Sequence, residues 1–160
     1  MISIEEAGID RIDELAAWRI ETLREVFSLP ADADMTQLEA ENRAYYEREI
    51  PRSGHVACFA RLDGVIVGCA GMCLQTELPS PDNPSGRCAF LMNVYTRPES
   101  QHRGAGRAMI EWLVDQAIDR GIDKIYLETS AAGRRLYESV GFTDLPDFMI
   151  HRKKPEKTNR

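Results

Sequence analysis

NVYTRPESQHRGAGR, residues 93–107, joins two segments of very different pattern. The run that leads into it, residues 87–95, is almost entirely apolar, which predicts a strand covered on both faces. The segment after it repeats apolar residues at helical spacing up to Gly121, where an αL cap ends a predicted helix. These residues therefore carry the chain from a buried strand into an amphipathic helix.

This strand-to-helix junction predicts an anion site. Gly104 and Gly106 let the backbone approach a ligand closely. The unpaired amides of the first helical turn, together with the helix dipole, favour phosphate oxygens. Positive side chains gather in the same segment of an otherwise acidic chain: Arg97, His102, Arg103 and Arg107. The junction therefore indicates a ligand that carries phosphate.

Two common phosphate motifs do not fit the segment. A Walker loop ends in Gly-Lys-Ser or Gly-Lys-Thr, and the sequence contains neither. A dinucleotide fingerprint requires a third glycine three residues after Gly106, where Met109 stands. The pattern therefore points to another class of phosphate-bearing ligand.

Two motifs carry a resemblance to a known family. QHRGAG, residues 101–106, lies just beyond Pro98 and resembles the cofactor motif Gln/Arg-x-x-Gly-x-Gly/Ala of the GNAT superfamily of N-acetyltransferases. AGRRLYESVGF, residues 132–142, is similar to the later motif of that family, a short helix with Leu-Tyr-Glu before Gly-Phe. The order of these two motifs and the distance between them also resemble the family pattern. The resemblance covers about residues 55–152, whereas the first fifty residues match only loosely the variable, substrate-facing helices of the family.

The resemblance implies acetyl-coenzyme A (acetyl-CoA) as cosubstrate and no metal. The amides of residues 102–107 are expected to hold the pyrophosphate, and the backbone of residues 94–96 is expected to pair with the pantetheine arm, as a peptide adds to a strand edge. Gln101 replaces the commoner arginine of the motif, so one cationic contact is expected from Arg103 or Arg107. The expected cofactor-binding residues are Val94, Tyr95, Thr96, Gln101, His102, Arg103, Gly104, Ala105, Gly106, Arg107 and Ser130.

The resemblance also implies transfer of the acetyl group to a primary amine by direct attack in a ternary complex. Tyr137 is expected to donate a hydrogen bond to the departing thiolate; the alternative is a core tyrosine whose hydroxyl bonds the backbone. An amide near Val94 is expected to polarise the thioester carbonyl. Glu128, Glu77 or water is expected to accept the amine proton, although most glutamates are simply solvated. Ser130 either faces the cofactor or forms a turn.

The rest of the chain alternates helical and strand patterns. Helices are predicted over residues 10–27, with Asp10 as cap, and over residues 36–50, where Thr36 and Glu39 have capping-box spacing. The other predicted elements are strands over residues 55–62, 65–75, 124–128 and 147–152, and a short helix over residues 133–140.

One domain is expected over residues 1–160, with residues 151–160 as a frayed basic tail. Asp63-Gly64 between two β-rich runs predicts a tight hairpin. The expected fold is α/β in the GNAT manner, with an α+β mixed sheet that is mostly antiparallel, a splayed parallel strand pair, and helices on both faces.

Charge and hydropathy limit the partners. The net charge is −6, although the last ten residues are basic, so the body of the chain is acidic. An acidic body argues against nucleic-acid binding and is compatible with a cationic amine as substrate. No apolar run approaches the ~20 residues that cross a bilayer, and the amino terminus lacks a secretory pattern, so we expect no membrane contact and a cytoplasmic location. Dimers are common in the superfamily that the chain resembles, so a homodimer is compatible with this sequence.

The four cysteines stand in apolar, strand-like runs and are expected to be core thiols: Cys58, Cys69, Cys73 and Cys88. A zinc site is the alternative, but there is no Cys-x-x-Cys pair and the histidines are far apart.

Two other function classes stay open. One is a module that binds acyl-CoA as a sensor without turnover, and the other is a nucleotide-binding protein that uses the same helix terminus. All three classes use the glycines of residues 104–106, but only the enzyme requires Tyr137 and an open acceptor groove.

Overall fold

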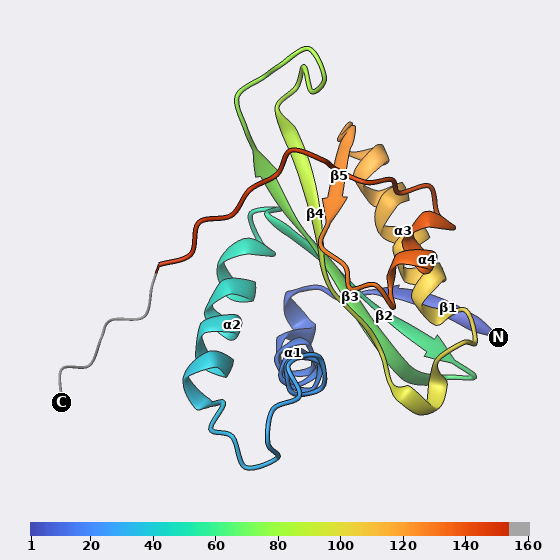
Figure 1. The fold of residues 1–160 in the computed structure, drawn as a ribbon. Helices are drawn as coiled ribbons and strands as arrows, with labels where there is room; N and C mark the ends of the chain where they lie inside the picture. Colours follow the sequence, from blue (N-terminus) through green and yellow to red (C-terminus); the bar gives the residue numbers. More distant parts are fainter. Residues whose placement is uncertain (154–160) are drawn as a thin grey trace.

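The computed structural model describes residues 1–153, which form one sheet with helices on both faces (Figure 1). The strands are β1 (Ile2–Glu6), β2 (His55–Leu62), β3 (Val65–Thr76), β4 (Arg87–Thr96) and β5 (Lys124–Leu127). The helices are α1 (Ile12–Val26), α2 (Thr36–Glu49), α3 (Ala105–Asp119) and α4 (Arg134–Glu138), with 3-10 turns at Ile9–Arg11 and Pro98–Ser100. Neighbouring strands in the order β1-β2-β3-β4-β5 are antiparallel, except for the parallel pair β4 and β5. The expected mixed sheet is confirmed.

Two apolar cores, one on each face of the sheet, hold the helices in place. The amphipathic α3 buries Met109 and Leu113 completely in the first core. The second core joins Leu15 and Trp18 of α1 to Phe59 of β2. In Figure 1, α1 and α2 lie on one side of the sheet, and α3 and α4 lie on the other. Helices therefore cover both faces, as the sequence predicts.

Strand β4 is irregular where it leaves β5. Its register against β3 shifts beside Asn93, which has left-handed backbone with a φ of 59°. A bulge of this kind bends a strand and re-aims the groups next to it. The parallel ladder ends at the pair Leu91 and Leu127, whereas β4 continues to Thr96. Residues 92–96 therefore present an edge that β5 does not pair, which is the expected splay between the two strands.

The strand predicted over residues 147–152 is wrong. Asp147 has a φ of 71°, no strand is assigned to this segment, and the side chains of Phe148 and Ile150 are exposed. A strand exists only where a neighbouring edge accepts its hydrogen bonds, and an apolar pattern does not supply that edge. The Phe148 ring lies instead 6.3 Å from the ring of Tyr126 in β5. Of the predicted basic tail, residues 151–153 are exposed without regular structure, and residues 154–160 lie outside the described part of the chain.

The amino-terminal elements differ from the prediction in their details. β1 was not predicted, although Ile2 and Ile4 alternate with polar residues. The side chain of Asp10 makes no cap hydrogen bond to α1. The capping box of α2 is wrong too, because the amide of Thr36 donates its hydrogen bond to Oδ1 of Asp34 at 3.0 Å. A short acidic turn before the helix thus replaces the box.

The cysteines are free thiols: Cys58, Cys69 and Cys88 are buried in the sheet, and Cys73 is half-buried. Within residues 1–153, no cluster of three or more His, Cys, Asp or Glu side chains is arranged to hold a metal ion. In the same residues, no helix has both the length and the apolar character that a membrane span needs.

Candidate functional site

The first part of the site is the unpaired edge of β4. Val94 is half-buried and packs against the core beneath α3. The side chain of Tyr95 points to the opposite face, where it is buried beside Trp18 with 6.2 Å between ring centroids. Only the backbone of Tyr95 therefore faces the splay. A backbone edge of this kind can accept an extended chain that carries amide groups.

The second part is the start of α3. Gly104 is the residue before the helix and has a φ of 92°, a conformation that costs little only for glycine. No side chain caps this helix, and its first recorded bond runs from the amide of Ala108 to the carbonyl of Gly104 at 3.0 Å. Among residues 1–153, the backbone amides from His102 to Arg107 have no recorded protein acceptor. A run of free amides at a helix N-terminus is an anion site.

The cations of the segment do not all serve that site. Arg97 donates to both carboxylate oxygens of Glu21, at 2.7 and 2.9 Å, and its guanidinium lies over the ring of Trp18. Arg107 is paired with Glu111 at 2.8 Å, on the exposed side of α3. His102 and Arg103 are exposed and have no ion pair among residues 1–153. Arg103 is thus the cation that is free to contact a phosphate, and Arg97 is not.

Small residues bring α4 against the start of α3. A Cβ on Gly106 would lie 3.3 Å from Cδ2 of Leu136 in α4. Gln101 turns inward to the strand, since its Nε2 donates to the carbonyl of Thr96 at 3.2 Å. Ala105 is buried beneath the turn. The segment 101–106 therefore packs against Thr96 and α4 while the amides of residues 102–107 have no recorded protein acceptor.

Tyr137 of α4 is half-buried and packs edge-on against Phe142, with 5.8 Å between ring centroids. Among the residues that the structure describes, no hydrogen-bond partner is recorded for its hydroxyl. Burial raises the pKa of Tyr137, so the hydroxyl keeps its proton at neutral pH. The tyrosine therefore differs from a core residue that satisfies its hydroxyl internally: it is an available donor.

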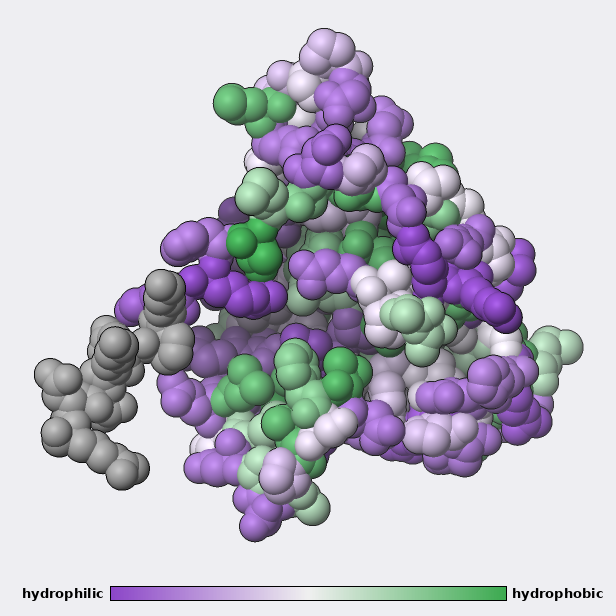
Figure 2. All heavy atoms as spheres, in the orientation of Figure 1, coloured by the Kyte–Doolittle hydropathy of each residue, from purple (hydrophilic) through white to green (hydrophobic). Residues whose placement is uncertain are grey.

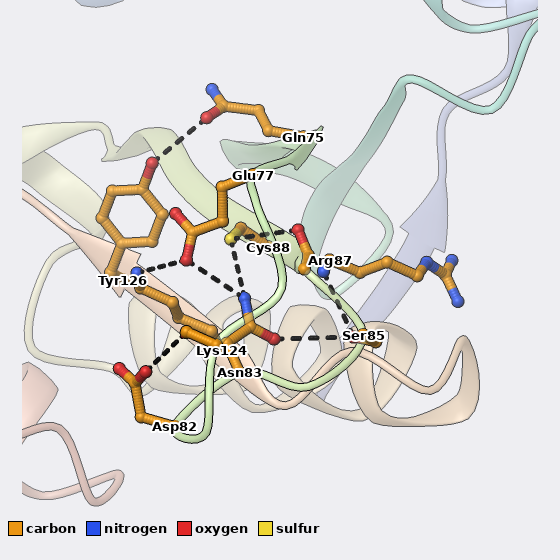
Figure 3. A network of polar contacts seen from close by, with 11 residues as sticks. Gln75, Glu77, Asp82, Asn83, Ser85, Arg87, Cys88, Lys124 and Tyr126 are labelled. Carbon is orange, nitrogen blue, oxygen red and sulfur yellow. Dashed lines mark hydrogen bonds and ion pairs between the residues drawn. The ribbon is translucent and has the colours of Figure 1, made fainter.

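The two candidate bases differ sharply. Glu128 follows β5 directly, is exposed, and has no recorded partner within residues 1–153. Glu77 accepts from Lys124 at 2.7 Å and from the buried Asn83 at 3.2 Å (Figure 3). These bonds, with Lys124 as the larger cause, lower the pKa of Glu77. Glu77 therefore anchors the loop after β3, and Glu128 is the carboxylate that is free to accept a proton.

Ser130 forms the turn that leads to α4. Its Oγ accepts from the amide of Gly133 at 3.3 Å, and its carbonyl accepts from the same amide at 3.2 Å. The turn interpretation is therefore sufficient for Ser130, although its hydroxyl proton stays available to a ligand.

Sequence reasoning missed two features of this region. The first is Asn83, which is completely buried and holds the loop between β3 and β4 through Glu77 and Cys88. A lone Asn between prolines carries no signal of burial. The second is a groove of about 510 Å³ lined by β5, α4 and residues 140–145, with no residue of β4. Tyr137 and Val114 of α3 are also among the residues that line it.

A mixed sheet with a splayed parallel pair and a free helix N-terminus defines a class of cofactor-binding α/β domains. The family model described as "Acetyltransferase (GNAT) family" matches residues 13–142. The chain belongs to this family.

Individual relatives are similar over different lengths. The [ribosomal protein bS18]-alanine N-acetyltransferase of Escherichia coli K12 is 41% identical over 59 residues, which are 35% of this chain and 40% of that protein. The IAA acetyltransferase of Azospirillum brasilense is 28% identical over 92 residues, or 56% of this chain and 55% of that protein. The chain thus covers about half or less of the length of these relatives.

Solved structures extend the similarity over the whole fold. A predicted acetyltransferase of Clostridium acetobutylicum, solved with acetyl-CoA, has a TM-score of 0.83 and is 26% identical. The comparison covers 95% of this chain and 96% of that one. The expected GNAT fold is confirmed.

Proposed function

We propose that this protein is an acetyl-CoA-dependent N-acetyltransferase that transfers the acetyl group to a primary amine by direct attack in a ternary complex. The observation that carries the proposal is the run of free amides from His102 to Arg107, beside the unpaired edge of β4. This pairing of an anion site with an open strand edge suits a ligand with a diphosphate at one end and an amide-bearing arm at the other. The similar protein from Clostridium, solved with acetyl-CoA, supports the same ligand.

Different residues bind the diphosphate and the pantetheine arm of acetyl-CoA. The amides of residues 102–107 hold the diphosphate, and Arg103 adds a cation that forms no ion pair with a carboxylate among the described residues. The backbone of residues 94–96 pairs with the pantetheine arm. Gln101 and Gly106 keep the turn against Thr96 and α4, so the amides point outward.

The chemistry requires three further contributions. Acetyl-CoA supplies the acetyl thioester and leaves as the thiol. The amide at the bulge near Val94 donates a hydrogen bond to the carbonyl oxygen as negative charge develops there. Glu128, or water at its exposed position, accepts the proton that the amine loses on forming the amide bond. Tyr137 donates a hydrogen bond to sulfur as the carbon–sulfur bond breaks.

Tyr137 acts chiefly as a hydrogen-bond donor. With ordinary pKa values of about 10 for tyrosine and about 8.5 for a thiol, full proton transfer is uphill by about 2 kcal/mol. Burial raises the pKa of Tyr137 and increases that cost. The thiolate therefore takes its proton partly from solvent.

The test combines binding and turnover. Calorimetric titration with acetyl-CoA is expected to give saturable heat, and free thiol is expected to appear only when an amine is present. The amines to use are polyamines, aminoglycosides, amino acids and peptides. Binding without thiol release for every amine would identify a sensor, and a preference for ATP or NAD would identify a nucleotide-binding protein. Absence of heat with acetyl-CoA would refute the proposal. The cytoplasmic location and the homodimer stay predictions.

A further inference from the structure

Arg19 of α1 is a half-buried cation that no carboxylate balances. Its Nε donates to Oδ1 of Asn42 in α2 at 3.2 Å, and its Nη1 donates to Oδ1 of Asn93 in β4 at 3.1 Å. Among residues 1–153, no carboxylate oxygen lies within ion-pair distance of this guanidinium. Two amide oxygens orient the group, but neither neutralises it.

Most other half-buried cations of the protein are paired with carboxylates, whereas Arg24 donates to main-chain carbonyls and Arg120 donates to Gln116. Arg11 and Arg61 share Glu5, Arg97 pairs with Glu21, and Lys124 pairs with Glu77. A charge withdrawn from water without an opposite charge is costly, and evolution of a stable fold usually removes it or pairs it. Arg19 differs from Arg24 and Arg120 because its acceptors lie on two other elements, α2 and β4, which hold the guanidinium beside the β4 bulge. A guanidinium has five N–H donors, and the two recorded bonds leave several of them free.

The surroundings of Arg19 are neutral. His55 is buried and forms a 2.9 Å hydrogen bond with the hydroxyl of Tyr45. Burial, and then the positive charge of Arg19, lower the pKa of His55 to about 4, so the imidazole is uncharged at neutral pH. Glu49 of α2, which also acts on His55, is paired with Arg48 at 2.9 Å. Positive charge at this place is therefore uncompensated.

The position of Arg19 ties it to the proposed reaction. Asn93, which it contacts, is the left-handed residue of the β4 bulge and precedes Val94, whose region is proposed to polarise the thioester. Arg19 reaches β4 from the face that α1 and α2 cover, opposite to α3 (Figure 1). Figure 2, in the same orientation, shows the surface hollowed beside α2, in front of β4 and β5. Arg19 therefore lies on this face of the sheet, at the β4 bulge.

We propose that Arg19 binds a carboxylate of the acceptor, and that the acceptor is therefore an amino-acid-like amine with its acid group close to its amino group. This inference rests on the proposed acetyltransferase function and names its substrate class. A planar guanidinium matches a carboxylate in two parallel hydrogen bonds, which fixes orientation as well as affinity. Asn93, which Arg19 contacts, directly precedes Val94, so a carboxylate on Arg19 would lie next to the strand segment proposed to polarise the thioester.

A purely structural role for Arg19 would give a different result. In that case the side chain only fastens α1 and α2 to the bulge, and its loss would impair every acceptor equally. The two roles are separated by acceptors that share one side chain and differ in whether the group beside the amine is a carboxylate or a neutral amide. L-phenylalanine with L-phenylalaninamide, L-methionine with L-methioninamide, and glycine with glycinamide are such pairs.

The experiment measures kcat/KM for these pairs by thiol release from acetyl-CoA, in the wild-type protein and in Arg19→Gln. Because the amine of an amide is less basic than that of its acid, the acid-to-amide ratio of kcat/KM is compared between the two proteins, and we expect it to fall in the variant for at least one pair. Arg19→Gln is expected to lose about 10- to 100-fold with that acid and to change little with its amide, as for the loss of a hydrogen bond to a charged group. Arg43→Gln removes an arginine of α2 that is paired with Asp13, and serves as the matched control with unchanged selectivity.

A second variant keeps the test independent of folding effects at Arg19. Asn42→Asp has the same side-chain size and places a carboxylate beside the guanidinium without removing it. It is expected to weaken acid acceptors selectively, because the internal carboxylate competes for Arg19. Equal losses with acid and amide, or an unchanged acid-to-amide ratio, in both variants would overturn the inference while thiol release still supports the acetyltransferase. Lack of acetyl-CoA binding or of any thiol release would overturn the proposed function, and this inference with it.

Discussion

The start of α3 offers a sharp test, because one glycine there combines a strained backbone with the proposed diphosphate site. Gly104 has a φ of 92° and carries the free amides on both sides of it. Gly104→Ala adds a methyl group in a conformation that costs an L-residue about 1–2 kcal/mol. That methyl group would also lie 3.3 Å from Cδ1 of Ile2, so the side chain of Ile2 in β1 must shift slightly. We expect a loss of about 1–2 kcal/mol in the free energy of unfolding.

The opposite end of the same helix supplies the control. Gly121 has a φ of 70°, and a Cβ on it would meet only Nη1 of Arg87 at 3.8 Å, an ordinary contact. Gly121→Ala is therefore expected to lose a similar free energy of unfolding without touching the site. The two variants share the cost of a left-handed alanine and differ in their distance from the proposed ligand.

The difference is expected in cofactor affinity. If Gly104→Ala relaxes toward a negative φ, at least one amide turns away from the diphosphate. A hydrogen bond to a charged group contributes about 1.5–3 kcal/mol, so the dissociation constant for acetyl-CoA should rise about 10- to 100-fold. Calorimetric titration measures the affinity, and urea denaturation measures the stability. Equal affinity for acetyl-CoA in both variants would refute the assignment of these amides.

Three further measurements examine other parts of the structure. Tyr137→Phe should lower kcat about 100-fold with little change in the KM for acetyl-CoA, because the free hydroxyl assists only the departing sulfur; an unchanged rate would remove that role. Asn83→Ala should lower the free energy of unfolding by about 1–3 kcal/mol in thermal or urea denaturation, since it leaves Glu77 and Cys88 without a buried partner. Lowering the pH from about 6.5 to about 4 should destabilise the wild type more than His55→Gln. The reason is that unfolded His55 protonates near its ordinary pKa of ~6.5, whereas the folded imidazole stays neutral down to about 4; identical pH profiles would contradict this.

Several elements could be predicted because their signals are local. The apolar run of β4, the glycines at 104 and 106 and the helical spacing of α3 all lie within one stretch of chain. Periods of two and of 3.6 residues describe neighbours along the backbone and need no knowledge of distant segments. The hairpin at Asp63-Gly64 was predicted for the same reason and joins β2 to β3.

The errors lie where local pattern competes with the surroundings. Residues 147–152 have a strand-like composition, yet no edge pairs with them in the structure. Thr36 has the spacing of a capping box, but its amide donates a hydrogen bond to Asp34 instead. Glu77 was a candidate base until the structure placed Lys124 beside it, 47 residues away in sequence. In each case another part of the chain settled the outcome.

The sequence alone thus identifies the family, the strand-to-helix junction and the candidate residues on it, because motif spacing and periodicity are written along the backbone. The arrangement around Arg19 is different. Its partners Asn42 and Asn93 stand 23 and 74 residues away, and the absence of a carboxylate near it among the described residues is a property of three packed elements. Hydrogen bonds act only over about 3 Å, so the partners of Arg19 can be identified only once folding has brought them together. The same holds for the absence of a carboxylate within ion-pair distance.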